Sequence, residues 1–200
     1  IVGYISDNNR IRFNIDKTYF SPRLSNERKE ISNFIKRGNV LVMFAGVGPY
    51  SIVIAKNPNV RKVFSNEINK EANKYGKLNV DLNKVRSKVT MLDGNIKNII
   101  NKIHTGLEIN NEKIPKYFDY IVMPRPQLKD SFLKEAFSLS KKGTRIFYYD
   151  FCAADDINNV VSKIILEAKR CRKKIKILKV KKSGEIAPYK FRIRVDFEVL

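Results

Sequence analysis

Two glycines and one acid carry the clearest chemical signal in this sequence. Gly46 and Gly48 lie in the turn 45–49, directly after the apolar run 40–44, and Glu67 ends the next apolar run. Glycine lets the backbone bend tightly and approach a ligand closely. In open α/β sheets an acid in the place of Glu67 accepts hydrogen bonds from the hydroxyls of a ribose. We therefore expect these residues to bind a nucleoside; the alternative is an ordinary turn beside a solvated acid.

The form of the turn narrows the class of ligand. It does not read G-x-G-x-x-G, because Ser51 stands where the third glycine would be, and no G-K-[ST] follows, which excludes a P-loop. A short G-x-G turn suits a nucleoside without a pyrophosphate, such as S-adenosyl-L-methionine (S-adenosylmethionine). We therefore expect this cofactor.

Two further segments end predicted strands at the same edge. Asp93 and Gly94 follow the run 89–92, and Asp93 can accept a hydrogen bond from the amine of an adenine or cap the following helix. The segment 123–127 reads Met-Pro-Arg-Pro-Gln, and its two prolines stiffen the backbone. This stiffness suits a slot that holds a base against the cofactor; the alternative is a rigid strand exit.

The charge balance points to a polyanionic partner. Forty Lys and Arg against 20 Asp and Glu give a formal net charge of +20, which favours nucleic acid. An anionic membrane surface and a lysine-rich thermophile surface are the alternatives. The densest basic stretch, 169–182, can contact phosphate or protect an exposed strand edge. The apolar runs are too short to span a membrane, so we expect no membrane partner.

Few residues remain for other chemistries. The single histidine, His104, lies in a polar stretch, which leaves Ser-His-Asp and Cys-His catalysis without support. The only cysteines, Cys152 and Cys171, fit neither a disulfide framework nor a zinc site. We expect a monomer in the reducing cytoplasm, with no metal.

The alternation of apolar runs with amphipathic segments predicts the fold. Strands are expected at 40–44, 63–66, 89–92, 117–123 and 144–151, and helices at 50–56, 69–78, 96–103, 131–139 and 157–168. Two strand-like runs, 175–180 and 191–199, follow without a helix between them and should pair antiparallel. This order indicates an α/β protein of the Rossmann-like class I methyltransferase type: a mostly parallel, twisted sheet with an antiparallel C-terminal hairpin at its edge.

The first twenty residues have a different pattern. Ile11, Phe13 and Ile15 alternate with polar residues, and this period of two predicts a strand or hairpin. A helical pattern begins at Ser25. We expect a short N-terminal segment, 1–20, followed by an S-adenosylmethionine-dependent methyltransferase domain, 21–200.

Five blocks of sequence carry a family resemblance. They are residues 19–28, with F-S-P-R-L, residues 43–52, with M-F-A-G-V-G-P, and the shorter blocks 66–69, 82–85 and 184–189. In this order they resemble the class I tRNA (guanine-37-N1)-methyltransferase family of archaeal and eukaryotic type, with its wyosine-pathway relatives. The resemblance covers nearly the whole chain. It implies S-adenosylmethionine as cofactor, the purine at position 37 of the tRNA anticodon loop as substrate, and a reduced or truncated extra domain in segment 1–20.

The resemblance also implies roles for single residues. Matched by position, the cofactor contacts fall on Arg28, Glu67, Ile68, Asp93 and Gly94, to which the neighbouring blocks add Phe44, Ala45, Gly46, Gly48 and Pro124. Arg23 matches the arginine that engages the target base. The expected catalytic set is Arg23, Arg125 and Asp93, with Asp93, a phosphate or water as the candidate proton acceptor.

One departure from the family pattern bears on the substrate. The family reads N-L-P after the fourth strand, and here Pro124 replaces an asparagine that would hydrogen-bond guanine. Proline offers only its carbonyl, so Arg125 would have to supply the donor. The change indicates an altered base, and both guanine N1 and C7 of a tricyclic wyosine intermediate stay open. Transfer of an aminocarboxypropyl group, or a basic RNA-binding module with a vestigial cofactor site, are the alternatives.

Overall fold

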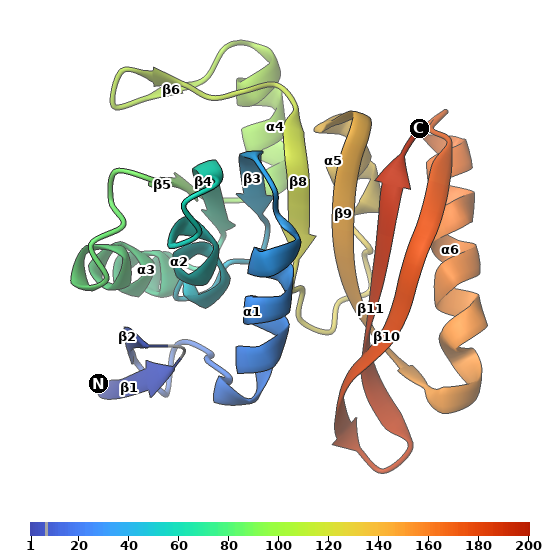
Figure 1. The fold of residues 1–200 in the computed structure, drawn as a ribbon, viewed down its shortest axis with the longest axis horizontal. Helices are drawn as coiled ribbons and strands as arrows, with labels where there is room; N and C mark the ends of the chain where they lie inside the picture. Colours follow the sequence, from blue (N-terminus) through green and yellow to red (C-terminus); the bar gives the residue numbers. More distant parts are fainter. Residues whose placement is uncertain (7) are drawn as a thin grey trace.

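A seven-stranded sheet between two layers of helices organises the chain (Figure 1). The computed structural model describes residues 1–6 and 8–200. The sheet has the order β10-β11-β9-β8-β3-β4-β5. The strands are β1 (Val2–Ser6), β2 (Asn9–Phe13), β3 (Gly38–Val42), β4 (Val60–Glu67), β5 (Val89–Asp93), β6 (Glu108–Ile109), β7 (Glu112–Lys113), β8 (Phe118–Met123), β9 (Ser140–Ala153), β10 (Ile175–Ala187) and β11 (Lys190–Val199).

The directions of the strands confirm the expected fold class. The five strands from β5 to β9 in the sheet order run parallel, whereas β11 and β10 pair antiparallel at one end. The order of the strands along the chain reverses between β3 and β8. In open α/β sheets, ligands bind outside the carboxyl ends of the strands at such a reversal.

Helices cover both faces of the sheet. The helices are α1 (Ser25–Phe34), α2 (Pro49–Ala55), α3 (Lys70–Leu82), α4 (Ile96–His104), α5 (Leu133–Ser138) and α6 (Ile157–Arg170), with the short helices η1 (Pro22–Leu24) and η2 (Ala154–Asp156). The first three share an apolar cluster with Val40 and Val42, and the last three share another with Leu41. Because β3 is buried on both faces, it reads as a continuous apolar run. No helix in the described part of the chain is long and apolar enough to cross a membrane.

The C-terminal hairpin and the segment between α4 and β8 depart most from the sequence-based expectation. β10 continues through Gly184 to Ala187, well beyond residue 180, because three register shifts along the β10–β11 pair accommodate the irregular residues. The hairpin of β6 and β7, between α4 and β8, was not predicted. Its two-residue strands are too short to show a periodic signal.

Asn79 of α3 and Asn83, the C-cap residue of that helix, hold the β1–β2 hairpin. The Asn79 side chain accepts from the Arg12 amide at 2.7 Å and donates to the carbonyls of Arg12 and Val47, each at 2.9 Å. Asn83 accepts from the Arg10 amide at 3.0 Å and donates to its carbonyl at 2.7 Å. These amide side chains form hydrogen bonds with backbone groups of β2, as a neighbouring strand would. Asn79 also links the hairpin to the glycine turn.

We expect Asn79→Ala to lower the free energy of unfolding by about 1–3 kcal/mol, because it leaves three backbone groups without their partner. Urea unfolding followed by circular dichroism measures the loss, and hydrogen exchange should rise first in the β1–β2 hairpin. Asn98→Ala, at an exposed position of α4, is the control and should change stability by less than about 0.5 kcal/mol. Equal stability of the two variants would contradict the assignment.

Candidate functional site

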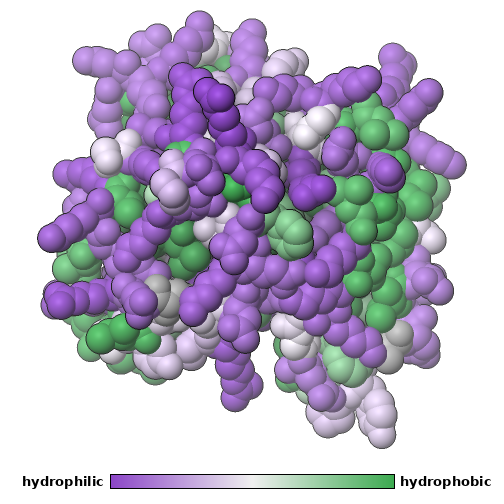
Figure 2. Space-filling model, in the orientation of Figure 1, coloured by the Kyte–Doolittle hydropathy of each residue, from purple (hydrophilic) through white to green (hydrophobic). Residues whose placement is uncertain are grey.

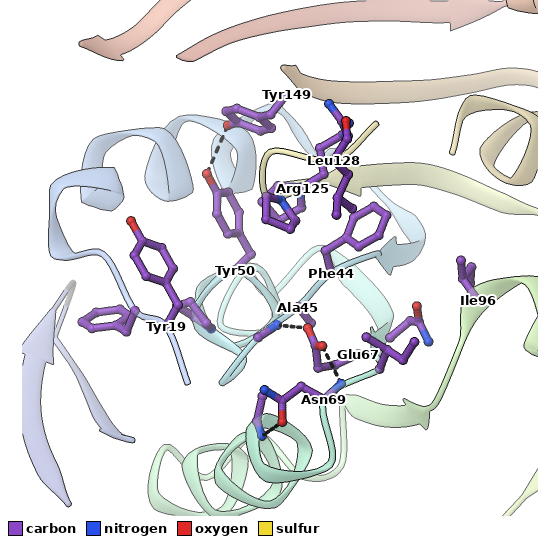
Figure 3. Close-up of a pocket in the computed structure, with 18 of the residues that line it drawn as sticks. Tyr19, Phe44, Ala45, Tyr50, Glu67, Asn69, Ile96, Arg125, Leu128 and Tyr149 are labelled. Carbon is purple, nitrogen blue, oxygen red and sulfur yellow. Dashed lines mark hydrogen bonds between the residues drawn. The ribbon is translucent and has the colours of Figure 1, made fainter. Parts of the chain in front are cut away.

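A cavity of about 460 Å³ lies at the carboxyl ends of the parallel strands (Figure 3). Its wall combines segments far apart in the sequence: part of 19–28, the glycine turn, the end of β4, residues 94–96 after β5, part of 124–132, and Arg192 of β11. Sites for small molecules usually measure about 300–1,000 Å³. The expected edge of the sheet therefore holds a cavity of a size suited to a nucleoside.

The turn between β3 and α2 has backbone angles that favour glycine. Gly46 and Gly48 have φ angles of 57° and 88°, in the left-handed region that side chains disfavour. Phe44 has a φ of 58°, and its ring meets that of Phe132 edge-on, with centroids 5.1 Å apart. Phe44, Ala45 and Gly46 line the cavity, whereas Gly48 shapes the turn as the N-cap of α2.

Glu67, the last residue of β4, is held by two backbone donors (Figure 3). The amide of Gly46 donates to its Oε2 and the amide of Asn69 donates to its Oε1, each at 2.8 Å. Each carboxylate oxygen keeps further lone pairs, so Glu67 can also accept from two adjacent hydroxyls of a ligand. The residue is 9% exposed and lines the cavity. A ligand would therefore meet an acid already fixed in position.

Asn66, the residue before this acid, joins the ends of β4 and β5. Its Nδ2 donates to the carbonyls of Leu92 and Gly94 at 2.7 and 2.9 Å. The amide of Gly94 in turn donates to the Glu67 carbonyl at 2.8 Å. Asn66 is buried and lines the cavity. Our sequence reasoning gave it no role, although a polar residue within a buried strand is the signal that could have found it.

Apolar side chains form a slot beside the acid. Ile68, which is 61% exposed, and Ile96, which is 3% exposed, line the cavity together with Phe44 and Gly94. Aliphatic and aromatic walls of this kind hold a flat ring by burial and dispersion. The expected contacts Ile68 and Gly94 thus lie where such a ring can bind.

Arg28 is buried below the wall formed by the N-terminal segment. Its Nη1 donates to the Ser21 carbonyl at 3.0 Å and its Nη2 donates to Ser6 Oγ at 2.8 Å. Its guanidinium lies 5.5 Å from the centre of the Phe20 ring. The residue lines the cavity, as expected for a cofactor contact, and its hydrogen bonds also hold that wall in place.

Arg125 stabilises the part of the cavity wall formed by residues 124–132. Its Nη1 donates to Asp150 Oδ1 at 2.5 Å, and its Nη2 donates to the carbonyls of Leu128 and Asp130 at 2.5 and 2.9 Å. The residue is 2% exposed, and its Nε is buried without a partner in the described chain. Arg125 and Pro124 both line the cavity. A role of Arg125 toward the base stays a prediction, but its guanidinium is already engaged in holding this segment.

Two expected catalytic residues lie outside the cavity lining. Asp93 forms an ion pair with Lys77 of α3, and both residues border a different hollow. Arg23 is exposed in η1, while its neighbours Ser21 and Leu24 line the cavity. The structure therefore does not bring Asp93 or Arg23 to the cavity wall, and their catalytic roles stay predictions.

A chain of hydrogen bonds leads from the cavity into the protein. The Tyr50 hydroxyl donates to that of Tyr149 at 3.2 Å, and Tyr149 donates to Glu27 Oε2 at 3.0 Å (Figure 3 shows the first bond). Arg194, buried in β11, donates to the same Glu27 oxygen at 2.7 Å. Burial raises the pKa of Tyr50 to about 12, so its hydroxyl keeps its proton at neutral pH.

An ionic cluster continues this chain and ties α1 to the C-terminal hairpin. Lys181 and Arg194 each contact both Glu27 and Glu30, with Lys181 Nζ 2.6 Å from Glu27 Oε1 and Arg194 Nη2 2.8 Å from Glu30 Oε1. Burial alone would raise the pKa of Glu27 and of Glu30. The hydrogen bonds and charges of the cations outweigh it, so the pKa of each lies below its usual range. Burial raises the pKa of Asp196, which accepts from Arg194 Nε.

Comparison with known proteins gives the family. The sequence profile described as the TRM5/TYW2 methyltransferase domain matches residues 5–178. The chain belongs to the TRM5/TYW2 methyltransferase family. The expected resemblance is thus confirmed over most of the chain.

Individual TRM5/TYW2 relatives agree with this assignment. The chain is 34% identical over 229 residues to the tRNA (guanine(37)-N(1))/4-demethylwyosine(37)-methyltransferase Taw22 of Nanoarchaeum equitans, covering 94% of this chain and 76% of the relative. The crystal structure of Trm5b from Pyrococcus abyssi matches with a TM-score of 0.82 and 30% identity, over 100% of this chain and 56% of that one. Methanocaldococcus jannaschii Trm5 in complex with adenosine matches with a TM-score of 0.78 and 26% identity, over 97% and 54%. The chain thus spans little more than half of these two crystallised proteins.

We expect Glu30→Gln to lower stability on the order of 1–2 kcal/mol at pH 7, and by less as the pH falls below about 4.3. A carboxyl whose pKa is lowered in the folded state contributes stability above its unfolded pKa and loses it as the pH falls toward the folded value. Urea unfolding of wild type and variant at pH 7 and pH 3 measures the change.

Glu108→Gln, at an exposed position of β6, is the matched control for the loss of one carboxylate. It should leave stability nearly unchanged at both pH values. A difference between wild type and Glu30→Gln that does not depend on pH would show that the ionic contacts are not its source.

Proposed function

We propose that this chain is an S-adenosylmethionine-dependent tRNA methyltransferase that modifies the purine at position 37 of the anticodon loop. The observation that carries the proposal is the Glu67 carboxylate, fixed by the amides of Gly46 and Asn69 at the wall of the cavity. The names of the family relatives support the substrate, since Taw22 acts on position 37 of tRNA. The net charge of +20 agrees with an RNA partner.

The residues of the cavity fit a nucleoside cofactor. Glu67 offers two oxygens to a ribose, and the turn at Gly46 lets the backbone approach closely. Ile68 and Ile96 offer apolar walls to a purine ring. The relative from M. jannaschii is in complex with adenosine, which is the nucleoside part of the proposed cofactor.

The chain contributes mainly by positioning its substrates. When bound, S-adenosylmethionine supplies an electrophilic methyl group on its sulfonium. The cavity wall must hold the target base in line with that group, and fixed geometry of this kind can supply a large part of a rate enhancement. A base in an RNA loop must leave its stack to enter the cavity. Pro124 and Tyr149 both line the cavity and can contact this base.

Two products are compatible with this wall. Methylation of guanine N1 requires a proton to leave the nitrogen, whereas at C7 of a tricyclic wyosine intermediate the ring electrons attack and a proton leaves afterwards. Pro124 provides no amide donor, and the Nη groups of Arg125 are occupied by Asp150, Leu128 and Asp130. Arg125 Nε, which has no partner in the described chain, is a donor of this segment that these contacts leave unused, and both products belong to the proposal.

Incubation with methyl-labelled cofactor and transcripts that carry either base at position 37 tests the function. We expect label in one of the two RNAs and a mass increase of one methyl group on base 37. A larger increase, matching an aminocarboxypropyl group, would replace methylation by that transfer. Absence of modification in both RNAs, together with absence of S-adenosylmethionine binding, would favour the RNA-binding module with a vestigial cofactor site.

We also propose that the enzyme is a monomer in the cytoplasm. A strongly positive surface opposes association of identical copies. Figure 2 shows that hydrophilic residues cover most of one face. Cys152 and Cys171 are free, as suits a reducing compartment. Light scattering after size exclusion, at physiological salt, should give the mass of one chain.

We expect Glu67→Gln to weaken S-adenosylmethionine binding by about 1–3 kcal/mol, because the fixed carboxylate loses its charge and one acceptor. Isothermal titration calorimetry measures the change. Glu71→Gln, in the first turn of α3 outside the cavity lining, is the control and should bind like wild type. Unchanged affinity of Glu67→Gln, with the fold intact by circular dichroism, would exclude Glu67 as the ribose ligand.

A further inference from the structure

The tip of the β10–β11 hairpin presents an exposed aromatic ring. β10 ends at Ala187 and β11 begins at Lys190, so Pro188 and Tyr189 form the turn. Tyr189 is 81% exposed, and its φ of 60° is uncommon for a bulky residue. Single exposed aromatics are common on protein surfaces. Tyr189 differs from such residues in its position relative to the cavity.

The register of the sheet places this tip at the edge where the cavity opens. Lys190 lies opposite Ala153 and Arg192 opposite Phe151, at the carboxyl end of β9. β9 runs parallel to β8, whose carboxyl end leads into the cavity wall. Arg192 itself lines the cavity. The hairpin extends past this edge of the sheet (Figure 1, bottom) and projects from the molecular surface (Figure 2, lower right).

Cations surround the base of this tip. Lys182 Nζ lies 4.2 Å from the centre of the Phe191 ring, and the Arg192 guanidinium lies 5.1 Å from that of Phe151. Lys190 is exposed, and Glu185 is the acid in the same hairpin end. Three cations against one carboxylate favour contact with a phosphate backbone. An exposed ring among cations beside a cavity is the combination that single-stranded nucleic acid requires.

We propose that Tyr189 stacks on an unpaired base of the RNA loop that neighbours the base inserted into the cavity. The inference rests on the proposed function, because it takes the anticodon loop as the occupant. Flipping one base out of a stack uncovers the faces of its neighbours, and an aromatic side chain at the rim can cover one of them. Proteins bind single-stranded RNA loops largely by such stacking. Pro188 limits the freedom of the turn, so the ring is presented with little loss of entropy.

An anticodon stem–loop RNA with 2-aminopurine at position 36 or 38 tests this contact, using the full chain. We expect Tyr189→Ala to raise the dissociation constant for this RNA about tenfold or more, since stacking on one base has that size of effect. The change in 2-aminopurine fluorescence on binding should be lost in Tyr189→Ala at the contacted position. Tyr189→Phe keeps the ring and should bind like wild type. Affinity for S-adenosylmethionine should stay unchanged in both variants.

Tyr117→Ala is the matched control, because Tyr117 is also exposed but precedes β8 at the opposite edge of the sheet. It should bind the RNA like wild type. If wild type binds and modifies RNA while Tyr189→Ala keeps the same dissociation constant and fluorescence change, the stacking contact is overturned and the proposed function stands. Equal loss in Tyr189→Phe and Tyr189→Ala would also overturn it, because the hydroxyl would then be the binding group. Failure of wild type to bind RNA would remove the proposed function and this contact together.

Discussion

The hydrogen bonds to the Glu67 carboxylate are the constraint on which the rest of the site depends. One donor, the amide of Gly46, belongs to the turn after β3, and the other, the amide of Asn69, belongs to the start of α3. A single side chain thus joins the turn that leaves β3 to the segment that leaves β4. Glu67, which binds a ribose in our proposal, therefore also fixes the turn that contains Gly46.

Side-chain amides complete this junction where backbone pairing ends. Parallel strands leave carbonyls and amides unpaired at their carboxyl ends, and buried polar groups of this kind must find partners. Asn66 satisfies two carbonyls at the end of β5 and its exit turn, Asn73 Nδ2 donates to the Glu67 carbonyl at 2.8 Å, and Asn79 holds the glycine turn and the N-terminal hairpin. The cavity is thus rigid on the cofactor side before any ligand arrives.

The sequence allowed the fold and the acid–glycine pair to be predicted, but not the partners of most other site residues. The run 40–44 and Glu67 were recognisable because strands buried on both faces read as apolar runs and the site lies where they end. Nothing local shows that Asp93 pairs with Lys77, or that Arg125 pairs with Asp150, because these partners meet only through the tertiary fold. The same limit hid the buried contact between Glu27 and Arg194. Packing decides which charged residues far apart in the sequence form pairs, and the periodicity of the sequence gives no information about these pairs.

The hydrogen bonds of Arg125 bear on the replacement of the family's asparagine by Pro124. A proline at this position removes an amide donor, and an arginine beside it would compensate only if its guanidinium were free to face the cavity. Its Nη groups instead bind Asp150 and two carbonyls of the segment that follows. Asp150 is itself held, since Tyr148 donates to its Oδ2 at 2.9 Å. The pair therefore stabilises the segment that follows Pro124 and leaves Arg125 Nε as a guanidinium donor without a partner among the described residues.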